Sequence, residues 1–423
     1  MFTKSLTAMA LFGSLAAPAV AAHATPASAE AAGVKLAWSG GKVQVTWTED
    51  TAAANTISLV RPGTADKQIG TTTAAGANQL LVDPSVLEPV HDTAATAKIR
   101  VTGGGADALS AAFDRYLRGE SAIAAELAAG QVVNWSAFDY ATDTTPNDPL
   151  DQDQLRYLPQ LVQAQCKVVQ LPVRTASNGT IGNQSQPFNL KVYTASNWGE
   201  SYLGVKPVRT STLTMSAPSS TAFGSTISFT GGVSLRQIKE SGSTCVNADD
   251  PAKARIQIAL QARNSATSPW YAVGVANTDA QGKYSFSVPN PGAREYRTAL
   301  NGSLNGDVQY QTITASKVVR ATTRTMSAKF VAPVITLRQK PNAYLWVNPA
   351  LSQKAALQYQ TGNGDWQGIT STTLSGGKGY SGEFNFNRRG VYSFRWWVSG
   401  STTGTGLPVD ASYTNTFTLT IVS

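Results

Sequence analysis

Histidine is the scarcest residue that could act as a general base in this chain of 423 residues, because it occurs twice, at His23 and His91. We expect His23 to be removed with a secretion signal. A Ser-His-Asp hydrolase site would then have to be built around His91, which Asp92 follows directly. A loop histidine exposed to solvent is the simpler interpretation.

The sequence also lacks the other common catalytic motifs. It has no Gly-x-Ser-x-Gly elbow, no paired-histidine zinc helix, no phosphate-binding Gly-Lys-Ser/Thr loop, and no Gly-x-Gly-x-x-Gly following a predicted strand. We therefore expect no catalytic residue, no metal site and no cofactor. Catalysis by a pair of carboxylates leaves no motif and stays open as an alternative.

Carboxylates gather in one stretch of fifteen residues, at Asp139, Asp143, Asp148, Asp151 and Asp153. Calcium takes six to eight oxygen ligands, and clustered loop carboxylates could supply several of them. The spacing matches no EF-hand, however, and aspartate before proline is common in plain turns. A calcium-binding loop and a solvated loop both remain open.

The chain has nine tryptophans, and sugar-binding surfaces use this residue to stack on pyranose rings. Adjacent Trp396 and Trp397 are the candidate ligand-binding residues, because successive residues of a strand face opposite sides and one of the two should point outward. Tryptophans at corresponding places in predicted strands are expected in the cores: Trp38, Trp47, Trp135, Trp270 and Trp366.

The elements that must position these residues are predicted to be β-strands. Residues 34–38 and 43–47 alternate apolar and polar side chains, which is typical of strands with one buried face. The chain has 36 glycines, and 14% of its residues are charged, a composition that suits many short strands and turns. Residues 121–127 favour a helical insert, and residues 155–162 a short helical turn.

A repeat of about 100 residues occupies the C-terminal half. Three aromatic residues recur 96 positions further on: Trp270, Tyr284 and Tyr296 as Trp366, Tyr380 and Tyr392. The sequence Thr-Met-Ser-Ala stands at residues 214–217 and again at 325–328, 111 positions later. The first copy therefore has 15 extra residues, which we place in residues 237–252. A repeat of this length indicates a sandwich domain rather than a solenoid turn.

Residues 279–288, with the sequence Asp-Ala-Gln-Gly-Lys-Tyr-Ser-Phe-Ser-Val, resemble bacterial Ig-like repeats of secreted actinobacterial proteins. The resemblance extends over residues 210–423, and residues 33–207 are similar to fibronectin type III-like modules only in short stretches such as the strand that ends at Trp47. The last copy departs from the pattern by its Gly-rich turn at residues 376–379 and by Trp396 and Trp397. The resemblance implies spacers, adhesion modules or glycan-binding appendages.

The two cysteines, Cys166 and Cys245, are predicted to form one disulfide between the second and third domains. An exported chain permits the bridge, and no other cysteine is available. Cys245 lies in the segment that the last repeat lacks, as expected of a segment added together with a partner. Two buried free thiols are the alternative. A closed four-ligand zinc site is excluded, because it needs more ligands than two thiols supply.

The predicted fold class is all-β, with tandem immunoglobulin-like or fibronectin-like β-sandwich domains. The expected parts are a signal peptide, a fibronectin-like sandwich, a second sandwich with a possible helical insert, an Ig-like sandwich with the 15-residue insertion, and a last Ig-like sandwich: residues 1–29, 33–103, 106–207, 208–320 and 321–423. The signal peptide predicts secretion. No later apolar run is long enough to span a bilayer.

Positive charge is concentrated in the second half of the chain. Residues 209–423 contain 20 Lys and Arg against 9 Asp and Glu, whereas residues 1–208 contain 14 against 17. This asymmetry favours an anionic cell-wall polymer or glycan as partner, and no nucleic acid is expected for an exported protein. Dispersed solubilising charge is the alternative explanation.

The sequence thus predicts a secreted, non-enzymatic cell-surface or extracellular protein that acts by binding, adhesion or spacing. The alternative is a polysaccharide-active enzyme or a carbohydrate-binding accessory protein, whose catalytic part would lie in residues 106–207. Two facing carboxylates in an organised cleft of that region would favour the enzyme.

Overall fold

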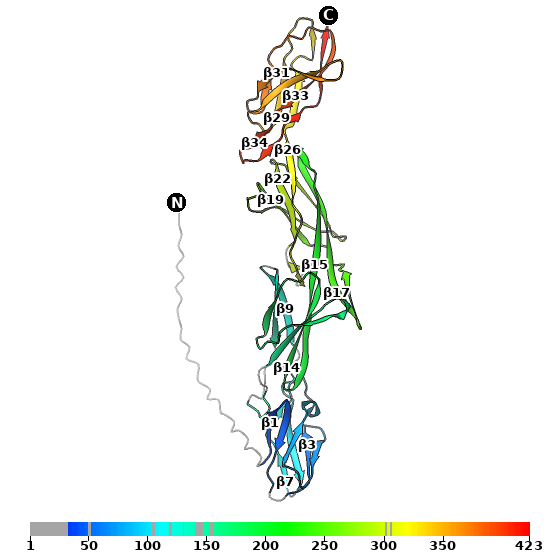
Figure 1. Ribbon diagram of the computed structural model, residues 1–423, viewed down its shortest axis with the longest axis vertical. Coiled ribbons are helices and arrows are strands. Elements are labelled where there is room, and N and C mark those ends of the chain that lie inside the picture. Colours follow the sequence, from blue (N-terminus) through cyan, green and yellow to red (C-terminus); the bar gives the residue numbers. More distant parts are fainter. Residues whose placement is uncertain are drawn as a thin grey trace, which may run out of the picture. The chain divides into compact units, whose positions relative to one another are not determined.

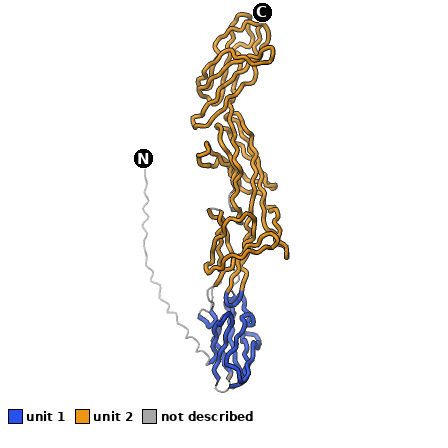
Figure 2. Tube along the Cα trace, in the orientation of Figure 1, with its two compact units in different colours: residues 1–117, 141–153, 196–199 blue, residues 118–140, 154–195, 200–423 orange. Residues whose placement is uncertain are grey.

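The structure is a computed structural model, and it describes residues 33–49, 52–103, 106–117, 121–129, 131–139, 147–151, 155–300, 303–304 and 307–423. The expected signal peptide lies outside the described residues. The chain forms two compact units, coloured separately in Figure 2. Unit 1 comprises residues 1–117, 141–153 and 196–199, and unit 2 comprises residues 118–140, 154–195 and 200–423.

The described chain is built almost entirely of β-strands, which confirms the predicted all-β fold class. The described helices are two short 3-10 turns, η1 (Pro84–Leu87) and η2 (Ala164–Cys166). The strands form pairs of sheets that face each other across apolar cores, so the architecture is that of tandem β-sandwiches.

Unit 1 is a sandwich of two antiparallel sheets. One has the order β1 (Lys35–Ser39), β2 (Lys42–Thr46), β5 (Gln79–Val82), and the other has the order β4 (Lys67–Thr72), β3 (Asn55–Val60), β6 (Thr96–Gly103), β7 (Ala106–Leu109), with β8 (Phe113–Asp114) also paired to β6. Val45 of β2 and Ile57 of β3 are both fully buried in the core between the sheets. The alternation seen in the sequence therefore marks the buried faces correctly.

The core of unit 1 also contains residues from well beyond the expected end of the first domain at Gly103. Phe113, Leu150 and Trp198 are all buried in it. The Trp198 ring lies edge-on to Trp38, with 5.1 Å between ring centroids. The expected break at residues 103–106 instead falls at the turn of the β6–β7 hairpin, where Gly103 pairs with Ala106.

The helical insert expected at residues 121–127 is wrong, because this segment is strand β9 (Ser121–Ala128). It pairs with β10 (Val132–Asp139), which pairs in turn with β13 (Asn178–Ile181). The alanines give the segment helix propensity, but Ile123, Ala125 and Leu127 alternate along β9 and pack against one core. The helical turn expected at residues 155–162 is likewise strand, β11 (Arg156–Val162).

Two long strands connect neighbouring cores within unit 2, and Figure 1 shows them in green. They belong to a sheet with the order β12 (Val168–Gln170), β11, β14 (Phe188–Ser196), β15 (Gly199–Ser216), β17 (Thr226–Ser241), β18 (Thr244–Asp249). Strand β15 supplies Leu203 and Val208 to one core and Met215 to the next. The boundary expected near Pro207 thus lies inside a continuous strand.

The C-terminal half has the same strand order twice, as the sequence repeat predicted. The first copy has β16 (Ser220–Ala222), β26 (Lys317–Thr322), β22 (Arg294–Leu300), β19 (Gln257–Arg263), β20 (Tyr271–Asn277); the second has β28 (Val334–Thr336), β37 (Phe417–Val422), β33 (Gly390–Val398), β30 (Lys354–Gln360), β31 (Trp366–Thr373). Each copy has a bulge at the corresponding place, Leu260/Gln261 in β19 and Leu357/Gln358 in β30.

The opposite sheets of the two repeats also correspond. In the first repeat β15 and β21 (Lys283–Pro289) flank β17, and in the last repeat β27 (Arg324–Phe330) and β32 (Lys378–Tyr380) flank β29 (Ala343–Asn348). Both repeats share the sheet order, but β27 has a bulge between Thr325 and Ser327 that β15 lacks. Beyond this bulge Ser327 aligns with Ser216, and Tyr380 aligns with Ser287 rather than with Tyr284, the partner that the sequence offset indicated. Differences between equivalent positions then indicate what is specific to each repeat.

Candidate functional site

The adjacent tryptophans of β33 lie on opposite sides of their strand. Trp396 is 0% exposed and belongs to the apolar core of the last repeat, so its prediction as a ligand-binding residue is wrong. Trp397 is half-buried and points to the outer face of the sheet. The alternation of the strand separates the two rings, as expected from β geometry.

A guanidinium group is stacked between two aromatic rings on this outer face. The guanidinium carbon Cζ of Arg395 lies 4.2 Å from the ring centroid of Trp366 and 4.0 Å from that of Tyr413. The Nε–H of Arg395 donates to Oε1 of Gln358 at 2.9 Å. Trp397 pairs directly with Tyr413 of β36 (Ser412–Tyr413). We call the surface formed by Gln358, Trp366, Arg395, Trp397 and Tyr413 the Arg395 face.

The preceding repeat has the same centre without the surrounding aromatic residues. Arg297 stacks on Trp270 at 4.1 Å, and its Nε–H donates to Gln261 at 2.8 Å. In the register of β22 with β25 (Thr312–Ile313), Ala299 and Ile313 occupy the places of Trp397 and Tyr413. The last repeat therefore has two large aromatic side chains where the earlier repeat has small or aliphatic ones.

The tryptophans shared by the repeats are not core residues, which corrects the expectation for Trp270 and Trp366. Both are half-buried on outer faces, where they contact arginine. The expectation holds for Trp47 and Trp135, which are buried, and Trp38 packs partly buried against its core. Trp366 begins edge strand β31 and Trp270 directly precedes edge strand β20, and no sequence pattern there indicates the outward orientation.

The Arg395 face has the chemistry needed to bind a sugar. Tyr413 is 54% exposed, and an aromatic ring offers an apolar surface to the C–H face of a pyranose. The terminal nitrogens of Arg395 have no hydrogen-bond partner among the described residues, which leaves donors for hydroxyl or anionic groups. The stacking and the Gln358 contact hold the guanidinium in place, so little rotamer freedom remains to be lost on binding.

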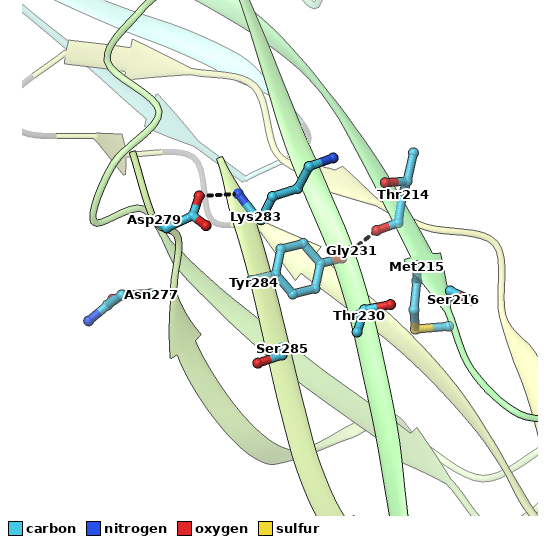
Figure 3. A pocket seen from close by; sticks show the side chains of 10 residues that line it. All are labelled: Thr214, Met215, Ser216, Thr230, Gly231, Asn277, Asp279, Lys283, Tyr284 and Ser285. Carbon is cyan, nitrogen blue, oxygen red and sulfur yellow. Dashed lines mark hydrogen bonds between the residues drawn. The ribbon is translucent and has the colours of Figure 1, made fainter. Parts of the chain in front are cut away.

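An open cavity lies in the preceding repeat, at the strands β15, β17 and β21 (Figure 3). It is an open hollow of about 720 Å³. The Tyr284 hydroxyl donates to the Thr214 carbonyl at 2.7 Å, and burial raises the pKa of this tyrosine. Asp279 accepts the backbone N–H of Lys283 at 2.8 Å within a turn. Asp279 is the single carboxylate among the lining residues, so they offer no pair of carboxylates.

A second hollow, of about 570 Å³, lies on the β9–β10–β13 sheet, in the region where the alternative enzyme would have its catalytic part. Its lining residues contain one carboxylate, Glu126. A glycoside hydrolase uses two carboxyl groups on either side of the scissile bond. These described lining residues therefore do not supply the pair of facing carboxylates that would favour the enzyme.

His91 lies exposed in a loop, with Nδ1 2.5 Å from the Leu117 carbonyl oxygen. The neighbouring Asp92 carboxylate accepts the backbone N–H of Ala94 at 2.9 Å. His91 thus contacts a distant backbone carbonyl, and Asp92 contacts a backbone N–H of its own loop. This arrangement matches the simpler sequence interpretation of a loop histidine.

The aspartate cluster is only partly described, because Asp143, Asp153 and the side chain of Asp139 lie outside the described residues. Asp148 accepts backbone N–H groups from Asp114 at 2.5 Å and Leu150 at 2.7 Å. Burial raises the pKa of Asp148 to about 6 despite these hydrogen bonds. No group of three or more metal-binding side chains occurs among the described residues. Calcium binding by the whole loop stays a prediction.

Cys166 and Cys245 form the predicted disulfide, with Cα atoms 4.8 Å apart. Cys166 lies in η2, directly after β11, and Cys245 lies in β18. Around the bridge, Val162 and Ile238 form a small apolar cluster with Cys245. The extra residues of this repeat thus form the tip of the β17–β18 hairpin, and the disulfide fixes that tip to η2.

The described residues include no helix of the length and apolarity that a membrane span requires. No family model matches the sequence, and no curated protein does.

Three solved structures share low similarity with the chain. A tetra-tandem repeat from the extending region of a large adhesion protein is 13% identical, with a TM-score of 0.28, over 92% of this chain and 99% of that one. Three N-terminal domains of the bacteriophage RB49 outer capsid protein Hoc are 11% identical, with a TM-score of 0.24, over 72% and 99%. Domains FN1–FN3 of chicken CNTN1 are 11% identical, with a TM-score of 0.23, over 69% and 98%. Likeness at this level carries no argument about function, and the fold assignment rests on the sheets described above.

Proposed function

We propose that this is an extracellular, non-enzymatic protein that binds a polysaccharide through the Arg395 face of its last repeat. The preceding sandwiches act as spacers. The four apolar cores, which contain Val45, Val133, Phe229 and Trp396, are the four consecutive domains of this proposal. Bacterial Ig-like repeats of exported proteins remain the family that the sequence resembles.

One observation carries the proposal. In both C-terminal repeats an arginine stacks on a tryptophan and donates a hydrogen bond to a glutamine. The last repeat alone has aromatic residues beside this group, where Trp397 and Tyr413 stand in place of Ala299 and Ile313. The shared strand order does not depend on these aromatic side chains, because the preceding repeat has the same strands without them. Partly exposed aromatic groups that the fold does not need are typical of a binding surface.

Two further features support export and binding. A disulfide joins the only two cysteines, and disulfides persist in oxidising compartments outside the cytosol. The excess of Lys and Arg in residues 209–423 favours anionic polymers or acidic glycans of a cell wall over neutral surfaces. An electrostatic contribution of this kind weakens as salt is added.

The test replaces the two aromatic residues by their counterparts from the preceding repeat. A Trp397→Ala, Tyr413→Ile double variant should fold normally and should bind insoluble polysaccharides and cell-wall fractions about tenfold more weakly in sedimentation assays. Tyr271→Ala is the matched control, because it removes an exposed ring from the preceding repeat. Unchanged binding by the double variant, or equal losses in the control, would contradict the proposal.

A further inference from the structure

The last repeat has a second aromatic surface on its other sheet. Two rows of side chains cross the three strands β27, β29 and β32. The register aligns Lys329 with Tyr344 and Tyr344 with Tyr380, and in the next row Ser327 with Trp346 and Trp346 with Lys378. Residues two positions apart on a strand share a face, so all six side chains lie on the outer side of the sheet. We call this surface the Trp346 face.

We propose that the Trp346 face binds an acidic polysaccharide whose sugar rings bear carboxylates. The proposal rests on the proposed function, because it assumes that the chain binds polysaccharides. It adds a second site, on the sheet opposite the Arg395 face, and it names the class of polymer. The Arg395 face and the Trp346 face lie on the two sheets that enclose one apolar core.

The Trp346 face combines stacking surface with positive charge. Trp346 is 37% exposed and Tyr380 is 55% exposed. Tyr344 and Tyr380 lie with their ring centroids 5.2 Å apart. The Lys378 ammonium group lies 5.0 Å from the centre of the Trp346 ring. A sugar ring stacked on this surface would therefore place a carboxylate substituent near a fixed ammonium group.

The preceding repeat again provides the internal comparison. The row that contains Trp346 corresponds there to Ser216, Thr230 and Ser285. In the other row, Ser228 and Ser287 take the places of Tyr344 and Tyr380. Part of this hydroxyl-bearing surface lines the open hollow of Figure 3. Trp346 thus corresponds to Thr230, and Lys378 corresponds to Ser285. The aromatic residues and the lysine are specific to the last repeat, although both repeats build the same sheet.

Charge complementarity selects the occupant. The six residues of the two rows include Lys329 and Lys378, both exposed, and no carboxylate. Residues 324–423 as a whole contain nine Lys and Arg against three Asp and Glu. A neutral polymer would use only the rings, and a simple polyanion only the charges. A polyuronate uses both, so it fits this surface best.

The experiment measures binding of the full chain to polygalacturonate, to neutral dextran and to polyglutamate, by affinity electrophoresis at low and high salt. Polygalacturonate should bind most tightly. Trp346→Thr should weaken this binding about tenfold, and Lys378→Ser up to about fivefold with a smaller dependence on salt. Both substitutions introduce the residue of the preceding repeat, so the sheet should remain intact. Lys340→Ser is the charge control, because it removes an exposed lysine outside the face.

The outcomes separate this proposal from the proposed function. Polygalacturonate binding that survives Trp346→Thr, or that is lost only in the Trp397→Ala, Tyr413→Ile variant, would overturn the Trp346 face while leaving the Arg395 face in place. Equal affinity for dextran would overturn the role of charge, and equal affinity for polyglutamate would overturn recognition of sugar. Loss through Trp346→Thr combined with unchanged binding in the Arg395-face variant would support the Trp346 face and contradict the Arg395 face.

Discussion

At the scale of single residues, Trp396 and Trp397 show how one position in a strand decides the role of a side chain. Trp396 is surrounded by the core of the last repeat, whereas Trp397 lies beside Tyr413 on the outside. The two neighbours have identical chemistry. Their difference comes entirely from the alternation of the strand.

This difference predicts opposite effects of substitution. Trp396→Ala should lower the free energy of unfolding by about 3–5 kcal/mol, because it removes a large buried ring and leaves a cavity. Trp397→Ala should lower it by less than about 1 kcal/mol and should weaken polysaccharide binding instead. Urea unfolding and sedimentation assays of both variants check this. Equal losses of stability would show that Trp397 is a structural residue.

Asp148 gives a second prediction at this scale, on the pH dependence of unit 1. Burial raises its pKa to about 6 in the folded protein, from a usual value of 3.8. A raised carboxyl pKa means that folding favours the protonated form. The resulting stabilisation is fully present below the unfolded pKa and is lost as the pH rises through about 6.

Unit 1 should therefore melt at a higher temperature at pH 5 than at pH 7. Asp83 and Glu88 have lowered pKa values, through hydrogen bonds from Ser85 and Lys67, and they oppose this trend only at more acidic pH. Asp148→Asn should remove the difference between pH 5 and pH 7 in calorimetry. An unchanged difference in that variant would assign the effect to other groups.

At the scale of elements, the disulfide connects two pieces of structure that are distant in sequence. It ties η2 to the tip of the β17–β18 hairpin, across 79 positions of the chain. The same hairpin also contacts β14, where Glu240 accepts hydrogen bonds from Asn189 at 2.7 Å and from Lys191 at 2.7 Å. The disulfide is therefore one of several contacts that hold the hairpin in place.

Removing the bridge should destabilise unit 2 without unfolding the hairpin completely. In the chain-entropy description a loop of this length is worth about 4 kcal/mol. A Cys166→Ser, Cys245→Ser double variant should lose about that much free energy of unfolding, and amide exchange should rise in β18. Reduced wild-type protein is the control and should behave like the variant. Unchanged exchange in β18 would show that the polar contacts to β14 suffice.

At the scale of the whole molecule, the chain consists of two compact units with separate apolar cores. Each unit should therefore respond to its own perturbation. Differential scanning calorimetry should resolve at least two transitions, because proteins with several cores seldom unfold in one step. Reduction of the disulfide should shift only the transition of unit 2, and a change from pH 7 to pH 5 should shift chiefly that of unit 1. A single transition that moves under both conditions would contradict this division.

The sequence by itself determined the features that depend on local patterns. Alternation in residues 34–38 and 43–47 marks strands whose buried faces the structure confirms. The repeat of about 100 residues predicts two domains with the same strand order, and this order is observed. The offset of 96 positions holds for Trp270 and Trp366 but not for Tyr284 and Tyr380. The pairing of Cys166 with Cys245 follows because no other cysteine is available. Each of these inferences needs only neighbouring residues, a fixed offset or a count.

Only the tertiary structure decided which distant segments meet. Leu150 and Trp198 return to the core of unit 1, and no local pattern shows that a later segment completes an earlier core. Segment β9 is a strand because β10 pairs with it and its alternating side chains reach a core, which overrides the helix propensity of its alanines. The Trp346 face likewise exists only after three strands, separated in sequence, align Tyr344, Trp346 and Lys378 in one register. Strand pairing is a long-range interaction, so the sequence supplies the residues of such a surface but not their arrangement.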